Sequence, residues 1–181
     1  RVVKQILIPE NIVSVENQLL GLSPLPPTEE TEIEFSGKTR RIQEVLERKK
    51  QIILYGPPGT GKTYWAYQAT VDIVSKNIFN TAFNELDDQK KGVITGDNQN
   101  LGYVRICTFH PSYGYEDFME GYRPESNDGV LSFQLRQGIF KRLCQDAVLE
   151  PDKKFYLIID EINRGDIPRI FGELLTVLEK D

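Results

Sequence analysis

The sequence predicts an α/β domain built on a parallel sheet, and three observations support this class. A glycine-rich loop at 56–63 follows the short apolar run 51–55 and precedes a helical pattern. A second and fully apolar run, 155–159, ends in two acidic residues. Between these runs, strand-like and helix-like segments alternate, which is typical of βαβ units. With 181 residues, of which 39% are hydrophobic and 27% charged, the chain has the composition of a globular domain with a core.

The chain begins with a linker-like segment and a helix. Residues 1–35 combine a short apolar segment with the acidic, proline-rich stretch 22–30, which is typical of an extended linker. We therefore place the main domain at 36–181. Its first helix is expected at about 38–50, where a narrow apolar stripe recurs with helical spacing at Ile42, Val45 and Leu46.

The middle of the chain predicts two further strand–helix pairs. The strand 51–55 leads into the glycine-rich loop, and a helix follows at about 61–75. Polar runs within 76–100 indicate exposed loop. A second strand is expected at about 103–109, and a short helix with aromatic flanks within 111–124.

The last third of the sequence predicts a hairpin and the final strand–helix pairs. Asn127-Asp128-Gly129 is a turn signal before the alternating strand 130–135. A helix is expected at about 139–149, ending before a proline. The run 155–159 is typical of a strand buried on both faces. One last helix is expected from Ile167, with Asp166 as its N-cap.

The loop 56–63 has the sequence of a phosphate-binding loop. It reads Gly-Pro-Pro-Gly-Thr-Gly-Lys-Thr between a strand and a helix. Its glycines let backbone N–H groups face inward around anionic oxygens, and Lys62 can reach the β- and γ-phosphates. Thr63 offers a hydroxyl to Mg²⁺ at the positive end of the next helix. The residues expected to bind nucleotide are Gly56, Pro57, Pro58, Gly59, Thr60, Gly61, Lys62 and Thr63.

Asp160 and Glu161 are expected to complete this site. The carboxyl ends of parallel strands share one edge of a sheet, so Leu54 and Ile159 deliver the residues after them to the same place. Asp160 is then positioned to hold Mg²⁺ through water, and Glu161 to orient or deprotonate an attacking water. An acidic pair alone is as often a mere strand end. Combined with the phosphate-binding loop, it predicts hydrolysis of a nucleoside triphosphate.

Bulk properties exclude several other classes. The net charge of −5 gives no support to this segment as the main nucleic-acid surface. Cys107 and Cys144 are too few for a disulfide framework or a zinc site, so we expect buried free thiols in a reducing, cytoplasmic compartment. No apolar run reaches the length of a membrane span, and no signal peptide is evident. Because residue 1 is Arg and not Met, we expect a piece of a longer protein.

The two motifs together resemble those of AAA+ ATPases, and further segments resemble McrB-type NTPases in particular. These are the aromatic segment Thr108 to Pro124, the run Gly138-Ile139-Phe140-Lys141, the acidic loop Asp160 to Asp166, and Phe171-Gly172-Glu173-Leu174-Leu175. They occur in the order of the family and cover about Glu34 to Asp181, which makes the resemblance specific.

The resemblance implies a three-layer P-loop NTPase fold and a ring-shaped assembly. A hairpin at about 123–137 interrupts the second helix, similar to the helix-2 insertion of the clade that contains McrB-like and MoxR-like proteins. The family implies a homo-oligomer, usually a hexamer, with nucleotide between neighbouring subunits. McrB-type motors use GTP and drive a nuclease partner of the McrC type in restriction of modified DNA. Relatives in the clade use ATP, so the choice of ATP or GTP stays open.

Two departures from the family pattern limit what this segment is expected to do. Residues 1–35 are too short for the family's DNA-reading domain, so any DNA contact is expected to be indirect or through a missing domain. The sequence stops one helix after Asp160 and Glu161, before the family's sensor strand, arginine finger and helical lid. Residues 36–181 are therefore expected to be a partial large α/β subdomain, with weak or no hydrolysis by itself.

Smaller signals leave alternatives open. Arg164 is expected to stabilise charge on a neighbour's nucleotide, or else to be a solvated loop arginine. His110 is either a γ-phosphate sensor or a structural histidine. An aromatic cluster is expected to pack within the ring or against a partner protein rather than to stack on bases, because acidic residues interrupt it. It comprises Tyr113, Tyr115, Phe118 and Tyr122. The alternative function is a nucleotide-gated, MoxR-like remodeller or scaffold of a protein client. Glu161 argues against a copy that has lost hydrolysis.

Overall fold

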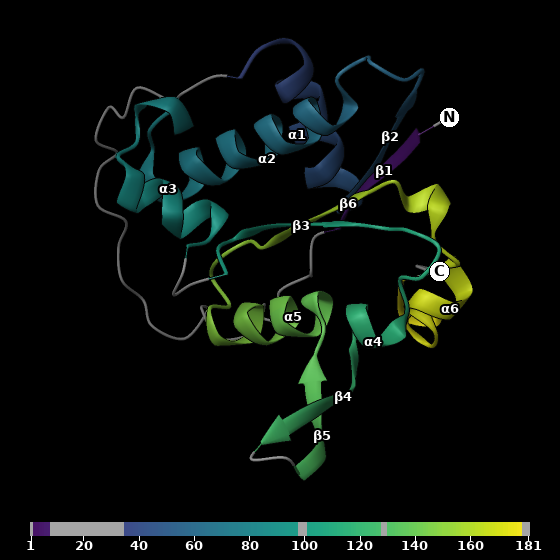
Figure 1. The fold of residues 1–181 in the computed structure, drawn as a ribbon. Helices are drawn as coiled ribbons and strands as arrows, with labels where there is room; N and C mark the ends of the chain where they lie inside the picture. Colours follow the sequence, from purple (N-terminus) through teal and green to yellow (C-terminus); the bar gives the residue numbers. More distant parts are fainter. Residues whose placement is uncertain (1, 8–34, 98–100, 128–129, 179–181) are drawn as a thin grey trace, which may run out of the picture.

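The computed structural model describes residues 2–7, 35–97, 101–127 and 130–178. Within these ranges the chain alternates strands and helices, as Figure 1 shows. The elements are β1 (Val2–Leu7), α1 (Gly37–Lys49), β2 (Gln51–Gly56), α2 (Lys62–Phe79), α3 (Asp88–Thr95), β3 (Val104–Thr108), α4 (Tyr115–Phe118), β4 (Glu120–Asn127), β5 (Val130–Gln137), α5 (Ile139–Leu149), β6 (Tyr156–Asp160), α6 (Ile167–Phe171) and α7 (Leu174–Leu178).

The main sheet contains the three predicted strands in parallel, plus one that was not predicted. Its order is β2-β1-β6-β3. β3 pairs with β6 in parallel, while β1 pairs antiparallel with both β2 and β6, so β2 also runs parallel to β6. The added strand is Val2–Leu7, which lies in the short apolar segment before the linker-like stretch and for which no secondary structure was predicted. This short segment lacks a clear strand pattern, and its pairing depends on neighbours distant in sequence.

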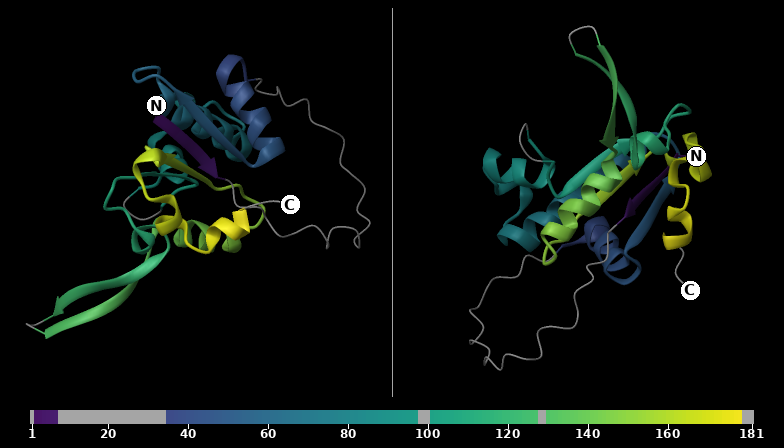
Figure 2. Two further views of the ribbon diagram at one scale, coloured as in Figure 1. Left: turned by 90° about the vertical axis from the view of Figure 1, so that its right-hand side faces the viewer. Right: turned by 90° about the horizontal axis from the view of Figure 1, so that it is seen from below.

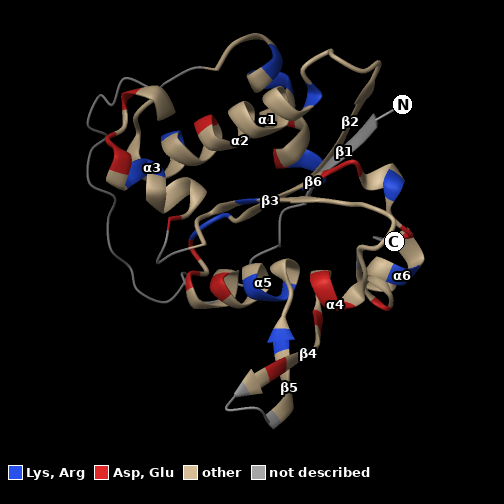
Figure 3. Ribbon diagram, in the orientation of Figure 1, with Lys and Arg blue, Asp and Glu red and all other residues tan. Residues whose placement is uncertain are grey.

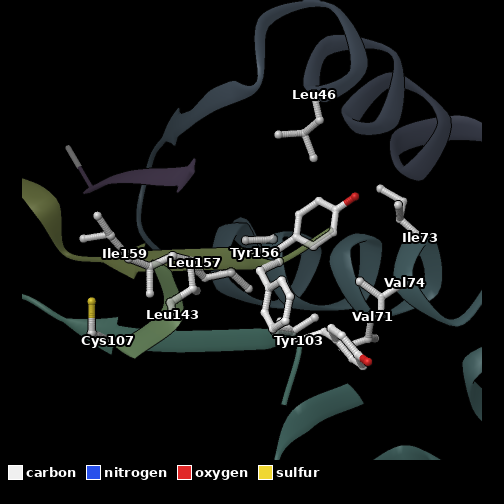
Figure 4. Close-up of a cluster of buried hydrophobic side chains, with 14 of the residues drawn as sticks. Leu46, Val71, Ile73, Val74, Tyr103, Cys107, Leu143, Tyr156, Leu157 and Ile159 are labelled. Atoms are coloured by element: carbon white, nitrogen blue, oxygen red, sulfur yellow. The ribbon is translucent and has the colours of Figure 1, made fainter. Parts of the chain in front are cut away.

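Helices cover both faces of the sheet. In Figure 1, α1, α2 and α3 lie on one side of the strands, and α4 and α5 lie on the other. β6 is buried from Tyr156 to Ile159, which explains why its sequence is apolar without alternation. Figure 4 shows Leu157 and Ile159 of β6 beside Leu143 of α5, with Val71 and Val74 of α2 among the same cluster. The core thus holds together the strands that precede the two sequence motifs.

Two helix predictions need correction. Residues 88–95 form α3, although the sequence indicated loop; Asp87 caps this helix by accepting from the Lys90 N–H at 2.8 Å, and Ile94 anchors it in the core. The single helix expected from Ile167 is instead divided into α6 and α7. The break falls at Gly172, whose φ of 51° and ψ of −128° lie outside the helical region.

The hairpin β4–β5 extends away from the body of the domain (Figure 2). Its first strand begins at Glu120, earlier than the expected 123, and its turn residues Asp128 and Gly129 lie outside the described residues. The base is held by ion pairs of Arg123 with Asp117 and of Lys141 with Glu120. Whether this hairpin corresponds to the helix-2 insertion of the clade remains a prediction.

Gly138, between the hairpin and α5, has no room for a side chain. Its N–H donates to the Met119 carbonyl oxygen at 2.5 Å, and a Cβ atom here would collide with the main chain of Phe118. We expect Gly138→Ala to lower the free energy of unfolding by about 3 kcal/mol, the upper end for overpacking, in urea denaturation. Gly92→Ala in α3 is the control: its Cβ would meet only the side chain of Asp97, so little or no loss is expected. Equal stability of the two variants would contradict this account.

Both cysteines are free thiols, as predicted, but only Cys107 is fully buried; Cys144 is half-buried. Burial raises the pKa of the Cys107 thiol to about 12, so almost none of it is thiolate at pH 8. We expect Cys107 to resist alkylation at pH 8 until the protein is unfolded, and Cys144 to react first. Mass spectrometry of iodoacetamide-treated protein checks the order. Faster modification of Cys107 would show that β3 opens readily.

None of the helices that the structure describes is long and apolar enough to cross a membrane.

Candidate nucleotide site

The loop 56–63 connects β2 to α2 with the backbone that its glycines permit. Gly59 and Gly61 have φ angles of 77° and 75°, in the left-handed region where other residues are strained. At Gly59 a Cβ atom would meet nothing within 4 Å, so backbone conformation and not space requires glycine there. α2 then begins at Lys62 and runs for 18 residues, which places the N-terminal end of a long helix at the loop.

Lys62 lies across its own loop. Its Nζ donates to the Pro57 carbonyl oxygen at 2.5 Å and lies 3.4 Å from the Thr60 hydroxyl oxygen. The Thr60 hydroxyl also donates to the Pro57 carbonyl at 2.9 Å. These contacts keep the ammonium group within the curl of the loop, where inward-facing N–H groups favour anions. The arrangement concentrates positive charge at the carboxyl end of β2.

The structure brings Thr63 and Asp160 together across 97 residues of sequence. The Thr63 hydroxyl donates to Asp160 Oδ2 at 3.4 Å. Thr63 is in the first turn of α2, and Asp160 ends β6; β6 and β2 run in the same direction, as the parallel-sheet rule required. The backbone N–H of Phe109 donates to the Asp160 carbonyl at 2.9 Å, which ties the end of β3 to the same edge.

Glu161 and Arg164 form a pair beside this contact. Glu161 has a left-handed backbone (φ 54°, ψ 37°), uncommon for a residue with a side chain and more frequent at functional sites. Arg164 Nε lies 3.1 Å from Glu161 Oε2. The arginine side chain is 64% exposed and the glutamate side chain only 23%. Arg164 is thus largely exposed although it is paired, while Glu161 is mostly covered.

The other residues that the sequence analysis singled out are His110 and the aromatic cluster. Of these, His110 is exposed, and two of the aromatic residues contact the core. His110 is exposed just after β3, with its ring edge-on to that of Tyr113 at 5.5 Å. Tyr113 stacks on Phe109, and Phe118 is fully buried against Phe140. Tyr115 donates its hydroxyl to Glu173. Tyr113, Tyr115 and Phe118 therefore have their contacts within the domain, whereas Tyr122 is exposed. The expected contacts within the ring or with a partner protein stay a prediction.

Sequence reasoning did not identify Trp65 as part of the site's surroundings. Trp65 lies one turn into α2, where its backbone N–H donates to the Gly61 carbonyl at 2.8 Å. The Lys38 ammonium lies 4.7 Å from the centre of its ring, a cation–π contact. Trp65 is the single tryptophan of the chain. Its indole is therefore a natural fluorescent reporter of events at the loop.

The donor set at this edge fits Mg²⁺. Thr63 and Asp160 present a hydroxyl and a carboxylate, the hard oxygen ligands that Mg²⁺ prefers. Within the described residues no group of three or more His, Cys, Asp or Glu side chains forms a metal cage. Two protein oxygens suit an ion that keeps several waters and takes further ligands from a phosphate chain.

Comparison with known proteins agrees with the sequence resemblance. No protein-family model matches the chain. The chain is 36% identical over 173 residues, 89% of its length, to the EcoKMcrB subunit of a type IV methyl-directed restriction enzyme of Escherichia coli K12. It is 25% identical over 185 aligned positions, 82% of its length, to the YdiS component of the type II restriction enzyme BsuMI of Bacillus subtilis 168.

The matched segment is only a part of each relative. It spans 32% of the length of the EcoKMcrB subunit and 47% of the length of YdiS. Within that segment the phosphate-binding loop, the Asp160–Glu161 pair and the α/β fold occur together. Over the region that they share, this chain is a homologue of the McrB-type restriction subunits.

Proposed function

We propose that residues 36–181 form part of the large α/β subdomain of an AAA+ motor that binds and hydrolyses ATP or GTP with Mg²⁺. The observation that carries the proposal is the contact of Thr63 with Asp160, because it joins the phosphate-binding loop to the acidic end of β6 at one edge of the sheet. The parallel sheet brings the two strand ends together, and the residue types found there, a glycine-rich loop with a lysine and a carboxylate beside a hydroxyl, suit a phosphate chain with Mg²⁺.

Each residue at this edge has a separate role in the proposed hydrolysis. The loop from Gly56 to Thr63 binds the phosphates through its backbone N–H groups, and Lys62 neutralises the β- and γ-phosphates. Thr63 and Asp160 would hold Mg²⁺, which would supply positive charge to the phosphate oxygens. Glu161 accepts a proton from the attacking water. Arg164 projects from the exposed side of the pair and stabilises the nucleotide of a neighbouring subunit.

For the whole protein, we propose a role in restriction of modified or foreign DNA. Both relatives are components of restriction enzymes, which favours this role over a MoxR-like remodeller. The motor would assemble as a homo-oligomeric ring, a hexamer in our proposal, and act on a nuclease partner of the McrC type. Hydrolysis by residues 1–181 alone is expected to be weak.

Asp160→Asn tests the proposed metal site in the full-length protein. We expect the apparent affinity for Mg²⁺ in nucleotide binding to fall about 10- to 150-fold, the loss for a charge-assisted contact worth about 1.5–3 kcal/mol. Titration of Mg²⁺ at fixed concentration of a fluorescently labelled nucleotide measures this change. Asp152→Asn, at an exposed position after α5, is the control and should behave like the wild type. An unchanged Mg²⁺ dependence in Asp160→Asn would remove Asp160 from the metal site.

A further inference from the structure

The turn 160–165 carries the two acidic residues of the candidate site on a strained backbone. Glu161 has a φ of 54° and a ψ of 37°, and a residue with a side chain stays in this left-handed region only where its surroundings hold it there. The 3₁₀ turn Ile162–Arg164 follows, and the Arg164 N–H donates to the Glu161 carbonyl oxygen at 2.8 Å. Because this contact is internal to the turn, it does not fix the turn on the sheet. The support comes from another part of the chain.

Phe109, just after β3, contacts both ends of this turn. Its backbone N–H donates to the Asp160 carbonyl oxygen at 2.9 Å, immediately before Glu161. Its side chain lies against Gly165, where a Cβ atom would be 2.9 Å from Cδ2 and 3.2 Å from Cβ of Phe109. Figure 3 shows charged residues at the end of β6 and in the turn after it, whereas the adjoining end of β3 carries none. Phe109 therefore supports the turn through one main-chain hydrogen bond and through packing.

Gly165 is required by space and not by backbone conformation, the reverse of Gly59. Its φ of −91° and ψ of 153° lie in the extended region that any residue adopts. A Cβ atom here would also lie 2.6 Å from Ile170 Cδ1, and the side chains of both Ile170 and Phe109 are fully buried. Core side chains are close-packed, so neither can move aside without displacing its own neighbours. A side chain at position 165 would therefore push the turn away from its support.

Aromatic contacts hold Phe109 itself in place. Its ring stacks on that of Tyr113, with the ring centres 4.9 Å apart. It also meets the rings of Phe118 in α4 and Phe171 in α6 edge-on, at 5.9 and 6.2 Å. Stacked and edge-to-face pairs are the favoured arrangements of aromatic side chains, and they add to the stabilisation from burial. The support of the turn is therefore fixed from several sides and can hold the turn in one position.

We propose that Phe109 and Gly165 are positioning residues for Glu161, because they fix both ends of the turn and so set the place of its carboxylate. A general base works only within hydrogen-bond reach of the proton that it takes, and a displacement of about 1 Å can cost on the order of 100-fold in rate. A shift of the turn leaves the phosphate-binding loop 56–63 unchanged. The expected signature is a loss of turnover without a loss of nucleotide affinity. This inference rests on the proposed function, in which Glu161 is the base.

Gly165→Ala tests the position of the turn, and Ile170→Val tests the reason for its loss. In the full-length protein we expect Gly165→Ala to lower steady-state turnover about 10- to 100-fold, with nucleotide affinity within a few-fold of wild type. Ile170→Val removes Cδ1, the atom closest to the added methyl group. Alone it should leave turnover near wild type, and combined with Gly165→Ala it should restore most of the lost turnover. Normal turnover in Gly165→Ala, or a double variant that is no faster than Gly165→Ala, would overturn the proposal.

Phe109→Leu, with Phe155→Leu as its matched control, separates positioning from stability. Both substitutions shorten a buried phenylalanine, but Phe155 lies just before β6, at the far end from the turn, where its ring contacts that of Tyr103. We expect similar losses in the free energy of unfolding, and a loss of turnover of about 10-fold or more in Phe109→Leu alone. Equal turnover in the two variants would reject Phe109 as a positioning residue.

Glu161→Gln in the same assay keeps the two proposals apart. Normal turnover in Glu161→Gln would reject the role of Glu161 as the base, and with it the proposed function of the turn. Normal turnover in Gly165→Ala and Phe109→Leu, beside an inactive Glu161→Gln, would reject only the positioning. Nucleotide affinity is measured in every variant, because a loss of affinity equal to the loss of turnover would show a disturbed phosphate-binding loop and would also contradict the inference.

Discussion

Lys62→Ala is expected to reduce nucleotide affinity about 10- to 150-fold, because it removes a charge-assisted contact with the phosphates worth about 1.5–3 kcal/mol. In the structure the Lys62 ammonium is held over the loop by the Pro57 carbonyl. The Lys62 ammonium group therefore already lies at the loop. When nucleotide binds, the group exchanges the Pro57 carbonyl oxygen for phosphate oxygens as its hydrogen-bond acceptors. Isothermal titration calorimetry with ATP and GTP, supported by Trp65 fluorescence, measures the loss.

Lys38→Ala is the matched control for this experiment. The substitution removes the same charge at a lysine that also lies near the loop, 4.7 Å from the centre of the Trp65 ring. Because Lys38 is outside the phosphate-binding loop, we expect a change of only a few-fold, within the range of exposed charges. Equal affinities of Lys62→Ala and wild type would reject the assignment of the loop. Equal losses in both variants would show that general positive charge, and not the motif, attracts the nucleotide.

The sequence allowed prediction of the site because its two halves follow from separate local rules. The phosphate-binding loop is a contiguous motif, and Asp160 follows an apolar run whose composition identifies a buried strand. The rule that parallel strands end at one edge then predicted the meeting of Thr63 and Asp160, which the structure shows. The roles of these residues in binding and hydrolysis stay predictions until the variants are measured.

The features that were missed depend on contacts between distant parts of the chain. β1 lies between β2 and β6 and has its pairing partners 44 or more residues away, so no local pattern indicates it. α3 lies in a polar run and is fixed by one buried side chain, Ile94. The break after α6 depends on the unusual backbone of Gly172, a residue that tolerates many conformations and therefore predicts none.

Glu161→Gln is expected to separate nucleotide binding from hydrolysis. The substitution keeps the size of the side chain and the left-handed backbone of residue 161, but removes the carboxylate that accepts a proton from water. General-base catalysis contributes about 10²- to 10⁴-fold, so we expect turnover in the full-length protein to fall by that factor. Nucleotide affinity should remain within a few-fold of wild type, because the phosphate contacts from Gly56 to Thr63 are unchanged.

Because Glu161 is paired with Arg164, the test of Glu161 needs a second variant that breaks the pair but keeps the carboxylate. The arginine lies 3.1 Å from the carboxylate, so Glu161→Gln removes the ion pair as well as the base. Arg164→Ala also breaks the pair but retains the Glu161 carboxylate. In mixed rings, an Arg164→Ala subunit whose neighbour supplies a wild-type arginine should keep its own turnover, whereas a Glu161→Gln subunit should not. Glu47→Gln on the exposed side of α1 controls for charge. Steady-state hydrolysis with matched binding measurements decides the case: normal turnover by Glu161→Gln would mean that another group activates the water.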